Sequence, residues 1–114
     1  MDWHKVIAAE EQQANLLPVN GLLQVKINGK KICLARNQDG YYAVQNNCPH
    51  ASGDLSLGWC EGSRIICPLH RYAYDLKTGR GIGDQGDAVR TYPVEQREDG
   101  LYLGLKDPWS WLKS

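Results

Sequence analysis

The sequence predicts an all-β fold made of short antiparallel strands. Three dipeptides that favour tight turns, Asn28-Gly29, Asp39-Gly40 and Asp99-Gly100, each separate two short runs rich in Val, Ile, Leu and Tyr. No segment of helical length repeats its apolar residues with the 3.6-residue period of a helix. We expect only residues 10–17, before Pro18, to form about one turn of helix.

The register of the first hairpin follows from its turn. If residues 28–29 occupy the two turn positions, apolar residues of both strands alternate onto one shared face, as expected for a strand pair that covers a core. The cross-strand pairs are then Ile27 with Lys30, Val25 with Ile32, and Leu23 with Leu34.

The other turns predict further hairpins. The second turn joins a strand that ends near Arg36 to residues 41–44, and the third joins residues 91–97 to residues 101–105. A shorter hairpin is expected to turn at Glu61-Gly62. One face of the last strand is expected to be buried, because its alternate residues are Leu101, Leu103 and Leu105.

Length and charge fit one small domain without a polyanionic partner. With 114 residues, the chain is long enough for a single domain, residues 1–114. Its 13 basic and 13 acidic side chains cancel, so we expect neither nucleic acid nor a membrane surface among its partners. The longest apolar runs are too short to span a bilayer, and the N-terminus has no signal-peptide pattern. We therefore expect a cytoplasmic protein that is a monomer on its own.

Residues 46–87 are rich in Gly, Cys, Pro and His and poor in regular pattern, which in a compact domain usually indicates function. They contain two motifs, Cys48-Pro49-His50 and Cys67-Pro68-Leu69-His70, separated by the sixteen residues 51–66. Each motif supplies one thiolate and one imidazole from a short loop. Such ligands suit zinc or an iron–sulfur cluster, whereas calcium and magnesium require oxygen ligands.

The order of the ligands favours the cluster. Structural zinc sites usually pair two thiolates in one knuckle and two imidazoles in another. This chain mixes the two types in each motif, as a cluster requires when Cys holds one iron, His holds the other, and each loop spans both irons. A zinc-stabilised interaction module stays the remote alternative. The remaining cysteines, Cys33 and Cys60, are expected to be reduced structural thiols.

The C-x-H and C-P-x-H motifs at this spacing resemble those of the Rieske [2Fe-2S] ferredoxin family. Leu55, Gly58 and the segment from Tyr74 to Gly79 match supporting positions of the family, and the resemblance extends to Asp99-Gly100. It implies a small antiparallel β-sandwich with an inserted cluster-binding subdomain, approximately residues 46–87, which carries two ligand loops.

The resemblance also implies the roles of the ligands. Cys48 and Cys67 would bind the inner iron of one cluster per chain, and His50 and His70 would bind the outer iron near the tip of the protein. With four protein ligands the cluster has no open iron position, so the chain is expected to be a one-electron carrier and not an enzyme.

Departures from the high-potential members of the family indicate a low reduction potential. Those members carry an additional Cys near each motif, and these two form a disulfide; here the corresponding positions hold Gly53 and Leu69. They also carry a Ser whose hydroxyl donates to the cluster, where this chain has Tyr72. Their second hydroxyl donor, a Tyr, is matched by Tyr74.

The family suggests two functions for a carrier of this size. The first is the soluble ferredoxin of a multicomponent dioxygenase, which passes electrons from a flavin reductase to a terminal oxygenase. The alternative is the small subunit of an NAD(P)H-dependent nitrite reductase, whose partner would be the large subunit. In both cases we expect the partner to bind at the tip formed by the two motifs, where Arg71 lies.

Overall fold

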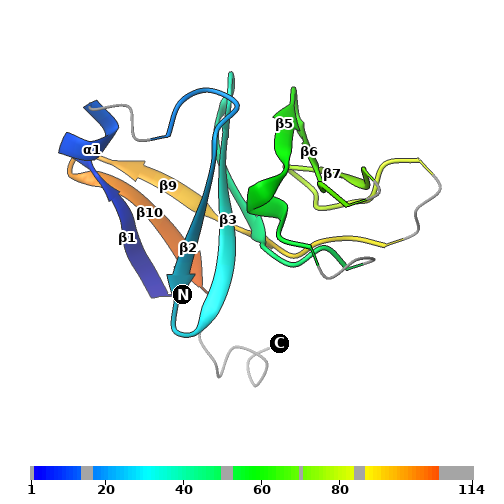
Figure 1. Ribbon diagram of the computed structural model, residues 1–114. Helices are drawn as coiled ribbons and strands as arrows, with labels where there is room; N and C mark the ends of the chain where they lie inside the picture. Colours follow the sequence, from blue (N-terminus) through cyan, green and yellow to red (C-terminus); the bar gives the residue numbers. More distant parts are fainter. Residues whose placement is uncertain (1, 14–16, 50–52, 70, 84–86, 106–114) are drawn as a thin grey trace.

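The computed structural model describes residues 2–13, 17–49, 53–69, 71–83 and 87–105 (Figure 1). Within these ranges the chain forms short strands, one short α-helix and one 3-10 turn, η1. The elements are β1 (Asp2–Ala8), α1 (Ala9–Gln13), β2 (Leu22–Ile27), β3 (Lys30–Asn37), β4 (Gly40–Gln45), η1 (Leu55–Leu57), β5 (Trp59–Glu61), β6 (Arg64–Ile66), β7 (Ala73–Asp75), β8 (Thr91–Tyr92), β9 (Val94–Arg97) and β10 (Gly100–Leu105).

The strands form three antiparallel sheets. Their strand orders are β1-β10-β9, β2-β3-β4-β8 and β5-β6-β7. Figure 1 shows the first two sheets facing each other, with the small third sheet on the other side of β3. The third sheet lies in the chain between β4 and β8, so it is an insertion. The predicted all-β fold, a sandwich with an inserted unit, is confirmed.

Strand β3 lies between two hydrophobic cores. Its side chains alternate between the two faces of its sheet, and each face belongs to a different core. Ile32 and Leu34 belong to the core between the two larger sheets, together with Leu101 and Leu103 of β10. Cys33 and Ala35 face the opposite way, into the core shared with the small sheet. All four of these β3 residues have no exposed surface. A strand covered on both faces therefore joins the sandwich to the inserted sheet.

The predicted hairpins are confirmed in register. Ile27 pairs with Lys30, Val25 with Ile32, and Leu23 with Leu34. Asn28 and Gly29 both have positive φ, 52° and 81°, as a two-residue turn of this type requires. The other predicted turns connect β3 to β4, β5 to β6, and β9 to β10. The three alternate leucines of β10 are buried, as expected.

Two expected elements differ in extent. Residues 91–97 were expected to form one strand, but Pro93 has no N–H and interrupts it. β8 before Pro93 pairs with β4, whereas β9 after it pairs with β10, so the chain changes sheets at this residue. The expected helical turn begins one residue earlier, as α1, and residues 14–16 lie outside the described ranges. Among the described residues, no helix is long and apolar enough to cross a membrane.

Candidate metal centre

The first ligand loop begins just after β4, and a backbone hydrogen bond closes it. The Cys48 N–H donates to the Gly53 carbonyl oxygen at 3.0 Å. Asn46, which has no exposed surface, anchors the start of the loop. Its side-chain amide donates to Gln24 Oε1 at 3.3 Å, and its Oδ1 accepts the Ser56 N–H at 3.1 Å. Asn46 thus ties the loop to β2 and η1, a role that no sequence pattern signalled.

The second ligand loop begins just after β6 and is closed in the same way. The Cys67 N–H donates to the Tyr72 carbonyl oxygen at 2.7 Å. In both loops the acceptor is therefore the fifth residue after the cysteine. Arg71 takes up the turn with a φ of 57°, in the left-handed region that non-glycine residues rarely adopt. In both loops a backbone hydrogen bond thus joins the cysteine to the residue five positions later.

The two cysteine ligands proposed from the sequence are brought together. Cys48 and Cys67 are 4% and 0% exposed, and their side chains are joined by a hydrogen bond. Burial, followed by the contact with Cys48, raises the pKa of the Cys67 thiol. The Cys67 thiol therefore keeps its proton at neutral pH in the metal-free protein, and a metal must displace that proton when it binds.

His50 and His70, the other two proposed ligands, lie outside the described residues. Their assignment stays a prediction from the motifs. In the described part of the chain, no three or more His, Cys, Asp or Glu side chains are grouped to hold a metal ion. The described half of the centre is thus the pair of thiols.

Tyr74 of β7 reaches the first thiol, as the sequence suggested. Its hydroxyl oxygen lies 3.5 Å from Cys48 Sγ and donates to Asp87 Oδ2 at 3.1 Å. Burial and then the two neighbours raise the pKa of the Tyr74 hydroxyl, so it keeps its proton at neutral pH. That one proton has two candidate acceptors, a sulfur and a carboxylate. Asp87 was not anticipated, because it is remote in sequence from both motifs.

The two loops pack together at Gly53 and Leu69. A methyl group added at Gly53 would lie 3.0 Å from Leu69 Cδ1 and 3.5 Å from Cys67 Sγ. Leu69 therefore fills the space beside Gly53, while 46% of its surface stays exposed. Van der Waals packing therefore holds the two loops together at this point.

Cys33 and Cys60 are buried in the core beside the small sheet, and both are free thiols. Burial raises the pKa of Cys33 to about 12 and that of Cys60 to about 11. The thiolate is the reactive form, so both side chains are inert at neutral pH. Their burial fits the expected role of structural thiols, which stays a prediction.

We expect Cys33→Ala and Cys60→Ala to leave the visible spectrum of the purified protein unchanged. Neither native thiol should react with a thiol reagent at neutral pH.

The raised pKa values of Cys33 and Cys60 also make the stability of the fold depend on pH, because the unfolded chain loses these protons near pH 9 and the folded chain only near 11 to 12. Their contribution to stability should therefore decline as pH rises above about 9. Denaturant titrations of native and variant proteins across this range measure it.

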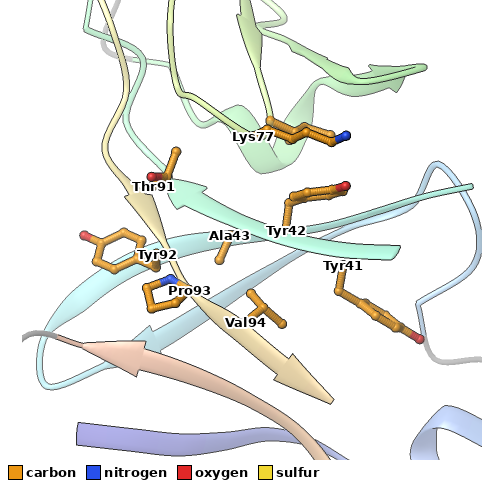
Figure 2. Close-up of a pocket in the computed structure, with 9 residues that line it drawn as sticks. Tyr41, Tyr42, Ala43, Lys77, Thr91, Tyr92, Pro93 and Val94 are labelled. Atoms are coloured by element: carbon orange, nitrogen blue, oxygen red, sulfur yellow. The ribbon is translucent and has the colours of Figure 1, made fainter. Parts of the chain in front are cut away.

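A surface hollow of about 420 Å³ lies along β4, β8 and β9, away from the two cysteines. Figure 2 shows Tyr42 pointing toward Lys77, whereas Tyr41 points to the opposite side of β4. Its lining residues thus come from both large sheets and from residues 76–77, just after β7. We read it as the uneven edge of the sandwich and not as part of the metal centre.

Comparison with known proteins identifies the motifs. The family model described as the Rieske [2Fe-2S] domain matches residues 2–93. The ferredoxin component of the naphthalene 1,2-dioxygenase/salicylate 5-hydroxylase systems of Ralstonia sp is 36% identical over 80 residues, which are 69% of this chain and 77% of that protein. The ferredoxin component of the naphthalene 1,2-dioxygenase system of Pseudomonas aeruginosa is 35% identical over 90 residues, 78% of this chain and 86% of the relative.

A solved structure has the same fold. The ferredoxin of carbazole 1,9a-dioxygenase from Nocardioides aromaticivorans IC177 superposes with a TM-score of 0.79 at 25% identity. The match covers 93% of this chain and 100% of that one. The similarity therefore includes the sandwich as well as the inserted sheet.

Proposed function

Because the chain belongs to the Rieske [2Fe-2S] domain family, we propose that it carries one electron from a flavin reductase to a terminal oxygenase. It acts as the ferredoxin component of a dioxygenase system and is not itself an enzyme. The observation that carries the proposal is the pair of matched loops, which bring the buried thiols of Cys48 and Cys67 together. Relatives named as ferredoxin components support the choice of partner system.

In this proposal one [2Fe-2S] cluster per chain is held by Cys48, His50, Cys67 and His70. The two buried, adjacent thiols fit the inner iron, because thiolate is its ligand and both cysteines are shielded from water. When bound, the cluster accepts and releases a single electron. Asn46 fixes where the first loop leaves β4, and Leu69 holds the second loop against the first. We assign residues 46–87 to the cluster-binding subdomain of a single domain, 1–114, located in the cytoplasm.

The purified protein tests the cofactor directly. A red-brown protein with iron and inorganic sulfide in equal amounts and a Rieske EPR signal is expected. A colourless protein that contains zinc would replace the proposal with the zinc-stabilised module. Electron transfer is then tested by following bleaching of the spectrum with a flavin reductase, and its recovery when the oxygenase is added.

The same experiment separates the alternative function. If the protein is instead the small subunit of a nitrite reductase, it should co-purify with the large subunit and leave an oxygenase unreduced. The genes that neighbour the gene of this protein indicate which oxygenase or nitrite reductase to use in the experiment. Reduction of the oxygenase but not of the nitrite reductase is the expected result.

We predict that Asp87→Asn raises the reduction potential. The Tyr74 hydroxyl donates to Asp87, and a carboxylate is a stronger acceptor than a thiolate sulfur in a neutral cluster. Without that carboxylate, the proton is available to the Cys48 sulfur, where a donor stabilises the reduced state. A hydrogen bond of about 1 kcal/mol corresponds to about 40 mV for one electron. Voltammetry of the two proteins measures the shift.

Tyr74→Phe is the control for this effect. Because Asp87 takes the proton in the native protein, Tyr74→Phe alone should change the potential little. In the Asp87→Asn background it should remove the part of the gain that the hydrogen bond supplies and leave the part that comes from the lost negative charge. If Tyr74→Phe alone lowered the potential strongly, the hydroxyl would already be donating to Cys48, and the role given to Asp87 would be wrong.

We predict that Arg71→Asn slows electron transfer to the oxygenase about two- to fivefold at low salt, as expected for one charge at the rim of an interface. Asn tolerates the left-handed backbone that Arg71 adopts, so the substitution removes the charge without changing the loop. The effect should disappear as the salt concentration rises. An equal rate at low salt would place the docking contact elsewhere on the tip.

A further inference from the structure

A hollow of about 480 Å³ lies between the β2–β3 turn and the start of the first ligand loop. It is lined by Gly29, Lys30, Lys31, Asn47, Arg90 and Tyr92. Figure 1 shows the β2–β3 turn at the lower end of the sandwich, and the chain after β4 running from the sandwich toward the inserted sheet. The three cationic side chains of the lining are exposed. We call this site the basic hollow.

Like charges meet directly at its edge. Lys26 of β2 pairs across the hairpin with Lys31 of β3. Like charges opposite each other in a sheet destabilise it, and an exposed hairpin position has no structural need for a cation. Strand alternation places both lysines on the same face of the sheet as Cys33. This face is turned toward the inserted sheet.

These cations are not neutralised within the part of the chain that the structure describes. Lys26, Lys30, Lys31 and Arg90 form no ion pair there. Elsewhere, Lys5 pairs with Asp99 at 3.0 Å in the far sheet. The chain has no net charge, so the basic hollow is a local excess of positive charge and not a property of the whole surface.

The hollow is joined to the first ligand loop by backbone contacts. Asn47, in its lining, immediately precedes Cys48, and the Asn46 N–H donates to the Lys31 carbonyl oxygen at 3.2 Å. On the other side, the Arg90 N–H donates to Gln45 Oε1 at 2.8 Å. A partner bound in the hollow therefore lies beside the loop that holds Cys48.

We infer that the basic hollow docks an acidic surface of the electron-transfer partner. Carboxylates on the partner would neutralise Lys26, Lys31 and Arg90 and hold it against the first loop. This inference rests on the proposed function, because it requires a protein partner that exchanges electrons at the loops. The partner would then contact the tip and, in addition, only that side of the protein on which β2 and β3 lie.

Small oxidants of opposite charge test the field of the hollow without any partner. The holo protein is reduced with dithionite, and its reoxidation by ferricyanide or by tris(phenanthroline)cobalt(III) is followed at low ionic strength. In each case one electron passes from the reduced protein to the metal complex. Lys31→Glu should slow the reaction with the ferricyanide anion about threefold and speed the reaction with the cobalt cation. Equal rates in native and variant proteins would overturn the inference.

Arg64→Glu is the matched control, with the same change of charge. Arg64 is exposed on β6 beside the β5–β6 turn. The carbonyl oxygen of Gly62 in that turn accepts from the Asn37 side chain, at the end of β3 remote from Lys31. This variant should react like the native protein. Lys31→Glu removes a like-charge pair, whereas Arg64→Glu creates one opposite Glu61, so a loss of stability cannot explain the expected order.

The partner arm uses the oxygenase identified from the neighbouring genes. Lys31→Glu should lower the rate of electron transfer to it about tenfold at low salt, and the difference should close at about 0.5 M salt. If the native protein reduces the oxygenase and Lys31→Glu does so equally fast, the docking inference is wrong while the function stands. If the native protein reduces no oxygenase but the two oxidants discriminate as expected, the proposed function fails and the field of the hollow stands. So few cations are not expected to hold double-stranded DNA at about 0.15 M salt. Tight binding to DNA under these conditions would therefore overturn the assignment to a protein partner.

Discussion

Replacing any one of the four proposed ligands with Ala is expected to abolish the visible and EPR signature of the cluster. Cys48→Ala and Cys67→Ala would each remove half of the protein ligands of the inner iron, and His50→Ala and His70→Ala would do the same at the outer iron. The cysteine variants also break the contact between the two buried thiols. Iron and sulfide analysis with EPR of the purified variants measures the loss.

Cys60→Ala is the matched control for the cysteine variants. It removes a thiol of the same core, but Cys60 lies on β5 and not in a ligand loop. This variant should keep its iron and its signal. A Cys67→Ala protein with an intact signal would contradict the ligand assignment. Loss of the cluster from Cys60→Ala would show that the cluster also depends on buried thiols that are not its ligands.

Much of the fold was predictable because its determinants are local. A two-residue turn such as Asn28-Gly29 fixes which residues pair, and the two-residue period of a strand then fixes which side chains share a face. The ligand motifs are equally local, since each loop carries its Cys and His within a few residues. For this reason Cys48 and Cys67 could be assigned together before their contact was seen.

The features that were missed depend on contacts between distant parts of the chain. β1 pairs with β10, so that Asp2 lies opposite Leu105 at the other end of the described chain, and no short-range pattern encodes that choice. Pro93 was read as one residue within a strand, whereas it separates two strands that belong to different sheets. Asn46 and Asp87 act through hydrogen bonds to partners far away in sequence, and a lone Asn or Asp carries no signal of its own.

Gly58→Ala is expected to destabilise the protein by about 3 kcal/mol, the upper end of the usual cost of overpacking a well-packed site. A Cβ at this position would lie 1.8 Å from the carbonyl oxygen of Ile66 and 3.2 Å from Pro68 Cδ. Ile66 and Pro68 flank Cys67, so the methyl group would have to push the start of the second ligand loop away from the end of η1. We therefore expect weaker cluster retention as well as a lower midpoint in denaturant unfolding.

Gly62→Ala separates this clash from the general cost of replacing a glycine. Gly62 has a φ of 60° and nothing within 4 Å of an added Cβ, so its substitution costs only the left-handed backbone, about 1–2 kcal/mol. Gly58 has a negative φ of −86°, so the cost of its substitution does not come from a left-handed backbone. Gly62→Ala should lower stability while keeping a full complement of iron, whereas Gly58→Ala should lower both. If Gly58→Ala retained its iron as well as Gly62→Ala does, the close approach of Ile66 would not be what positions the second loop.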